Sequence, residues 1–124
     1  MVNHAKRILV LDPKKSKTTA NKFELIHERL MSFHNEYVTE KVHNDQGWSG
    51  ICLSLGIFIG ELIKDSTKID FAWVYDKTPF SEDSIPFLRS EKLDLYVTDW
   101  VYKNIVYGNK ESMVDKYREL LKYL

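Results

Sequence analysis

Hydrophobic positions near the start of the chain follow helical spacing. Large apolar residues recur every three or four positions: Phe23, Ile26, Leu30, Phe33 and Tyr37. That recurrence is typical of one face of an α-helix. Thr18 or Thr19 can cap the N-terminus of such a helix with its hydroxyl. We therefore predict an amphipathic helix that reaches about Val38.

Residues 48–63, WSGICLSLGIFIGELI, are apolar on nearly every side of a helical wheel. A helix of this kind belongs inside a domain. Its small residues, Ser49, Cys52, Gly56 and Gly60, share one narrow stripe. Each glycine costs roughly 1 kcal/mol against alanine in a helix interior, so we expect another backbone to pack against that stripe. A bilayer span needs about 20 apolar residues, and this shorter run contains Glu61, so we expect no membrane segment here.

Alternating positions predict strands in the next part of the chain. Residues 69–76 place Ile69, Phe71, Trp73 and Tyr75 on one side and smaller or acidic residues on the other. Residues 77–86 contain two prolines and a polar run, so we predict a loop there. Residues 87–89 and 93–97 are further short strand candidates.

Two short helices are predicted at the end. Thr98 or Asp99 caps the first, over residues 100–107, and Gly108 closes it. Ser112 caps the last helix, which has one apolar face. The fold class expected is α+β, a single domain over residues 1–124 with helices flanking a small antiparallel sheet of two or three strands.

Composition is that of an ordinary globular domain, with 44% hydrophobic and 29% charged residues. We expect a cytoplasmic protein, because the N-terminal residues do not follow a secretory signal pattern. Cys52 is the single cysteine, which excludes an internal disulfide. The oligomeric state is not indicated by the sequence.

Charge is uneven along a chain whose formal net charge is zero. Residues 1–22 hold six Lys or Arg against Asp12 alone, and the remainder is correspondingly acidic. Residues 1–17 therefore form a basic, loosely attached N-terminal segment in our interpretation. Nucleic-acid binding through it is a third hypothesis, but no aromatic residue interleaves with its lysines and the acidic body would repel phosphates.

Motifs that carry catalysis are not found. The sequence has no phosphate-binding glycine loop, no Gly-x-Ser-x-Gly elbow and no His-Glu-x-x-His pair. His27 and His34 share a helix face, but a metal needs three or four converging ligands. We predict no metal, no cofactor and no catalytic residue, and whether the protein is an enzyme stays open. The alternative hypothesis is a small enzyme or small-ligand-binding protein with its site near Glu61.

Aromatic residues lie beside carboxylates in the second half of the chain. This combination is typical of surfaces that recognise other proteins. We predict a partner-binding surface for another protein, one with a basic face, built from Trp73, Tyr75, Asp76, Tyr96, Asp99 and Tyr102.

A resemblance to a family of small bacterial domains of unknown function rests on three segments. These are Leu55-Gly-Ile-Phe-Ile-Gly-Glu61, the strand Phe71-Ala-Trp-Val-Tyr75, and Asp99-Trp-Val-Tyr-Lys-Asn-Ile105 followed by Gly108. Residues 48–122 are similar to that pattern, although Asn104 stands where the pattern has arginine. The resemblance implies a protein-binding module of immunity or regulatory type, and it carries no catalytic residues with it.

Overall fold

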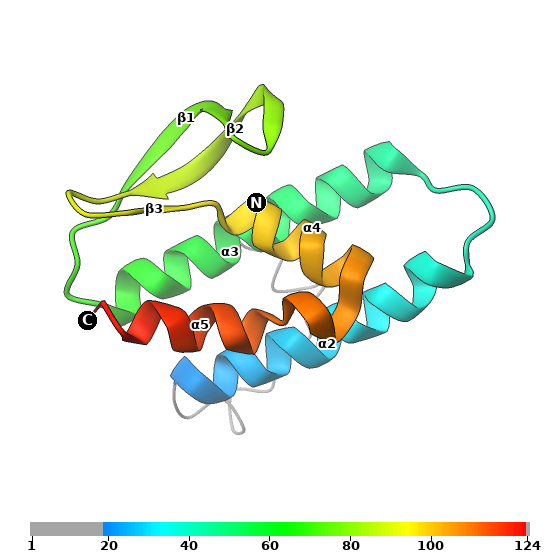
Figure 1. Cartoon of the computed structure of the whole chain (residues 1–124), viewed down its shortest axis with the longest axis horizontal. Coiled ribbons are helices and arrows are strands. Elements are labelled where there is room, and N and C mark those ends of the chain that lie inside the picture. The colour runs from blue at the N-terminus through cyan, green and yellow to red at the C-terminus, as the bar shows by residue number, and fades with distance from the viewer. Residues whose placement is uncertain (1–18, 124) are drawn as a thin grey trace.

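The computed structural model describes residues 19–123, and these residues form an α+β domain (Figure 1). The helices are α2 (Thr19–Thr39), α3 (Asp45–Ser66), α4 (Val97–Tyr107), the 3₁₀ turn η1 (Gly108–Glu111) and α5 (Met113–Leu121). The strands β1 (Ala72–Thr78), β2 (Ser81–Arg89) and β3 (Asp94–Leu95) form one antiparallel sheet in the order β1-β2-β3. The fold class predicted from the sequence is confirmed, whereas the basic segment 1–17 lies outside the described residues.

Helix α4 lies at the centre of the packing. It contacts α2, α3, α5 and strand β2, and its Val101 and Ile105 are almost wholly buried. Helix α2 lies against α4 and α5 and buries Phe23, Ile26 and Leu30, as its hydrophobic spacing predicts. The short helix α4 therefore joins the long helices and the sheet into one core.

The small-residue stripe of α3 is the place where α4 approaches most closely. An ideal Cβ atom on Gly56 would lie 2.9 Å from the Cα atom and 3.0 Å from the backbone nitrogen of Thr98. The predicted backbone contact is therefore confirmed at this glycine. At Gly60 the neighbour is instead a side chain, because the indole of Trp73 occupies the space that a Cβ atom would need.

The segment 77–86, predicted as a loop, is mostly strand. Thr78 pairs with Ser81, so only Pro79 and Phe80 form the turn of a β1–β2 hairpin. Pro86 lies inside β2 opposite Tyr75, which conflicts with the usual restriction of proline to strand edges. The conflict disappears because β3 pairs only with Leu88 and Arg89, which leaves β2 without a second neighbour at Pro86.

Helix α4 begins at Val97, with Tyr96 as its N-cap, and not at Trp100 as predicted from a Thr98 or Asp99 cap. Tyr96 makes no side-chain capping bond, but Val97 is fully buried, so core packing decides the start of the helix. The end is as predicted: Gly108 has φ +65°, a left-handed value that favours glycine.

Asn104 is the buried polar centre of the helical layer. Its Oδ1 atom accepts a 2.8 Å hydrogen bond from the Met113 backbone N–H at the start of α5. The same oxygen lies 3.3 Å from Nδ1 of His27. Nδ2 of Asn104 donates to the Gly108 carbonyl at 3.5 Å. One side chain thus ties α2, the end of α4 and the start of α5 together.

Replacing Asn104 by alanine is expected to lower the free energy of unfolding by about 1 to 3 kcal/mol, because the buried Met113 N–H loses its partner. Urea unfolding followed by circular dichroism measures the change. Asn109→Ala is the matched control, since Asn109 is exposed and contacts His27 from outside. Equal losses in the two variants would contradict the role of Asn104.

Helix α3 is longer than predicted, with 22 residues, and it has the length and apolar composition of a membrane span. Half of its apolar window is buried inside the protein. The core helix of a soluble protein passes the same test of length and composition.

Candidate functional site

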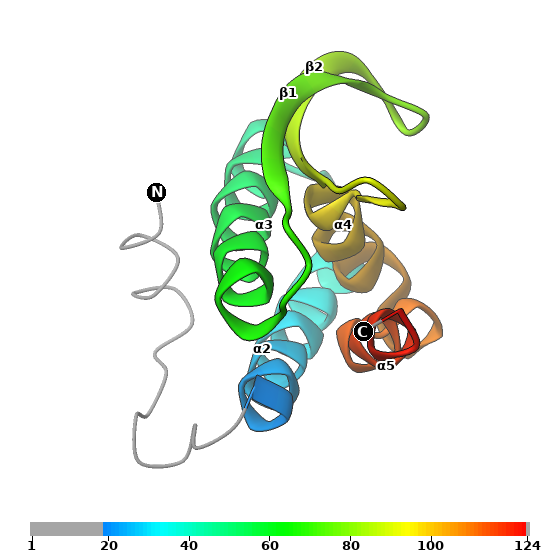
Figure 2. The ribbon, with the colours of Figure 1, turned by 90° about the vertical axis from the view of Figure 1, so that its left-hand side faces the viewer.

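A cleft of about 520 Å³ opens between the β1–β2 hairpin and the N-terminal halves of α3 and α4. The hairpin arches over this end of the helices (Figure 2). Its turn and the start of β2 supply one wall, including Phe80 and Asp83. The helices supply the other wall, including Cys52, Asp99 and Tyr102.

The cleft combines apolar rings with carboxylates. Phe80 is 54% exposed and Tyr102 is 48% exposed, so both rings present contact area to solvent. Asp83 is exposed, and Asp99 is half-buried in the first turn of α4. Partial burial raises the pKa of the Tyr102 hydroxyl above its ordinary value, and the nearby Tyr37 and Tyr107 hydroxyls act in the same direction. The cleft is therefore an apolar depression with acidic groups on both walls.

A lysine of the protein already lies at the rim of the cleft. The ammonium group of Lys103 is 3.3 Å from Oδ2 of Asp99 and 4.4 Å from the centroid of the Phe80 ring. The Phe80 ring also makes an edge contact with Tyr96, with centroids 5.5 Å apart. These contacts connect the hairpin turn to α4 across the cleft.

The six residues predicted to bind a partner occupy different surroundings. Asp99 and Tyr102 line the cleft, and half-buried Tyr96 supports it through Phe80. Tyr75 and Asp76 are exposed on β1, outside the cleft lining.

Trp73 differs from the other five predicted residues. It is half-buried against Gly60, and its indole Nε1–H donates a 2.6 Å hydrogen bond to Oε1 of Glu61. Glu61 therefore acts in the packing of β1 on α3, and it does not line the cleft.

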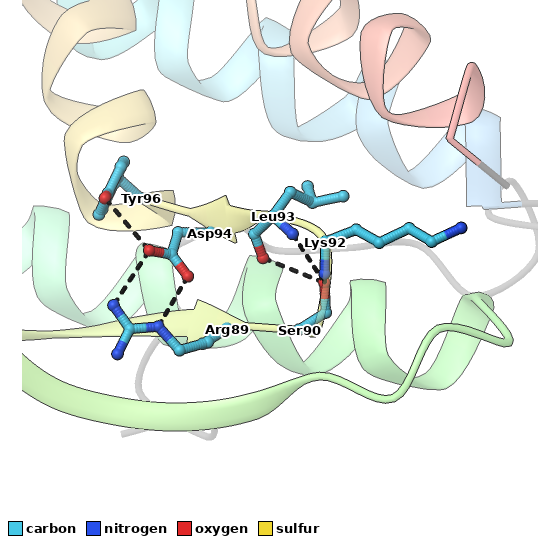
Figure 3. Close-up of polar contacts among 6 residues, drawn as sticks. All are labelled: Arg89, Ser90, Lys92, Leu93, Asp94 and Tyr96. Carbon is cyan, nitrogen blue, oxygen red and sulfur yellow. Dashed lines mark hydrogen bonds and ion pairs between the residues drawn. The ribbon is translucent and has the colours of Figure 1, made fainter.

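Asp94 belongs to a separate polar group at the β2–β3 edge (Figure 3). Arg89 donates to both of its oxygens, at 2.9 and 3.1 Å, and the Tyr96 hydroxyl lies 3.4 Å away. The hydrogen bond from Arg89 lowers the pKa of the Asp94 carboxyl. At the same turn the Ser90 hydroxyl accepts from the backbone N–H of Leu93 at 3.1 Å. These contacts hold β3 against β2.

The histidines of α2 make hydrogen bonds within the helical layer. Nδ1 of His34 donates to the Ile105 carbonyl at 2.7 Å, and Nε2 of His27 is 3.0 Å from Oδ1 of Asn109. Within residues 19–123, no group of three or more His, Cys, Asp or Glu is arranged to hold a metal ion.

Phe80 and Asp83 are two of the cleft residues that were not predicted from the sequence, and both fall in the segment predicted as a loop. The sequence gives little signal for them, because residues 81–86 are mostly polar and end in a proline although they form the first part of β2.

Comparison with known proteins gives no match: no family model, no curated protein and no solved structure matches the chain significantly. The resemblance to small bacterial domains therefore stays a prediction.

Proposed function

We propose that the protein is a protein-binding module, of the immunity or regulatory type that the resemblance implies, and that its hairpin and cleft bind a basic partner protein. The observation that carries this proposal is the cleft itself, which is lined by the exposed rings of Phe80 and Tyr102 together with Asp83 and Asp99. Aromatic anchors in a depression supply binding energy, and surrounding charges steer association.

The β1–β2 hairpin carries further exposed aromatic and acidic residues outside the cleft. Tyr75 is 74% exposed on β1, and Asp76 beside it is exposed as well. A partner that covered the hairpin and the cleft together would meet several carboxylates and three exposed rings. Such a surface favours lysine and arginine on the partner.

Photo-crosslinking from position 102 identifies the partner in the native host. A photoreactive phenylalanine derivative replaces Tyr102, and the control carries the same group at Val42, which is 86% exposed on the α2–α3 connection. We expect one specific product from position 102 and none of that size from position 42. The same product from both positions would place the interface elsewhere.

Charge reversal then tests the electrostatic part of the proposal. We expect Asp76→Lys with Asp83→Lys to slow association with the crosslinked partner by about tenfold at low salt, with a smaller effect at high salt. Glu28→Lys together with Glu36→Lys, two exposed positions on α2, is the matched control with the same change in net charge. Stopped-flow or surface-based association rates measure the effect. An unchanged rate with unchanged salt dependence would exclude the acidic hairpin as the steering surface.

A further inference from the structure

The cleft rim holds a complete binding site for a positively charged side chain. Asp99 supplies a carboxylate whose side chain is only 12% exposed, and Phe80 supplies the face of an aromatic ring. A cation gains from both groups, and it gains more where the carboxylate is partly withdrawn from water. Lys103 occupies this site from within the same protein.

The interaction of Lys103 with Asp99 and the Phe80 ring is weak. Lys103 lies one helical turn after Asp99 on α4, and an ion pair at this spacing adds little to the stability of a helix. The lysine side chain is 29% exposed and long enough to turn into water without moving the helix backbone. Asp83, across the cleft, is an exposed carboxylate with no ion pair to any residue in the part of the chain that the structure describes.

We propose that Asp99 and the Phe80 ring bind the cationic side chain of an arginine from the partner, which displaces Lys103. This inference rests on the proposed protein-binding function and names the group that the cleft recognises. A guanidinium group fits better than an ammonium, because its flat face stacks on a ring while its N–H groups bond both oxygens of one carboxylate. The lysine then acts as an internal competitor that lowers the affinity for any cation.

Arginine itself serves as the probe, so the test does not depend on the natural partner. The full-length ¹⁵N-labelled protein is titrated with N-acetyl-arginine-N-methylamide and, in parallel, with the citrulline derivative, which has nearly the same shape and no charge. We expect shifts of amide signals near Phe80 and Asp99 with the arginine derivative only, and loss of those shifts at high salt.

Two variants and a matched control test the roles of Lys103 and Asp99. Lys103→Met keeps an apolar stem of similar length and removes the competitor, so we expect the dissociation constant of the arginine derivative to fall about threefold to tenfold. Asp99→Asn is expected to abolish the shifts. The matched control is Glu36→Gln, because Glu36 is exposed on α2 and lies outside both the hairpin and the cleft lining. It is expected to leave the dissociation constant unchanged.

Several results would overturn this inference. Equal shifts with arginine and citrulline, no shifts at all, or unchanged or weaker binding by Lys103→Met would each do so, provided that the variants retain the wild-type pattern of remote signals. Crosslinking from position 102 would still succeed if the partner used other groups in the cleft. The arginine inference and the protein-binding function can therefore fail separately.

Discussion

Replacing Gly56 by leucine is expected to lower the free energy of unfolding by about 3 kcal/mol or more, which lowers the melting temperature by roughly 10 °C. Even the first carbon of the new side chain would lie 2.9 Å from the Thr98 Cα atom. A backbone cannot rotate away as a side chain can, so α3 and α4 must separate to admit the leucine. The same separation widens the floor of the cleft, because Thr98 and Cys52 both line it.

Gly50 provides the matched control on the same helix. Nothing lies within 4 Å of the Cβ atom that a substitution would add there. Gly50→Ala is therefore expected to stabilise the protein by up to about 1 kcal/mol, because alanine is the better helix former. Thermal unfolding of the two variants separates helix propensity from packing. A Gly56→Leu protein that melts at the wild-type temperature would show that the close approach of α3 and α4 is not required.

The Cys52 thiol is expected to react with iodoacetamide about a thousandfold more slowly in the folded protein than in urea. Burial, with a smaller contribution from the charge of Asp99, raises its pKa from 9.0 to about 12. Only the thiolate is nucleophilic, and three pKa units reduce its fraction at pH 8 by about a thousand. Mass spectrometry of samples quenched at successive times measures the two rates. Labelling of the native protein at a rate near that in urea would contradict the burial of Cys52.

The same shift makes stability depend on pH. The folded protein holds the thiol proton more tightly than the unfolded chain, so the contribution to stability is present in full below about pH 9 and is lost as the pH rises towards 12. The total is on the order of 4 kcal/mol. Cys52→Ala is expected to flatten the fall in stability over this range. Cysteine at this position therefore contributes to the packing of α3.

Hydrophobic spacing predicted the helices better than it predicted the sheet. Phe23, Ile26 and Leu30 face the core because their spacing leaves α2 only one apolar face. The predicted start of the second strand was wrong because Pro86 was taken as evidence for a loop. Proline is accepted at this position because β2 has no second neighbouring strand there. That neighbour depends on how far β3 extends, and β3 is fixed by the Arg89–Asp94 contact across the sheet.

The candidate site was predicted in part. Asp99 and Tyr102 were selected from the sequence, and they line one wall of the cleft. The other wall could not be predicted from the sequence, because it depends on the tertiary contacts of Phe80 over α4. There the Phe80 ring meets Tyr96 and Lys103. Exposed Tyr75 and half-buried Trp73 are two residues apart on one strand, and alternation alone does not separate them. The difference arises because Trp73 packs against Gly60 of α3.

The contact of Trp73 with α3 restricts which combinations of residues the fold can accept at the positions involved. Gly60 leaves room for the indole ring, and the next residue, Glu61, accepts its N–H. A larger residue at position 60 requires a smaller one at 73, and loss of the indole removes the need for a carboxylate at 61. We therefore expect positions 60, 61 and 73 to change together, so that a relative of this chain keeps all three residues or replaces all three.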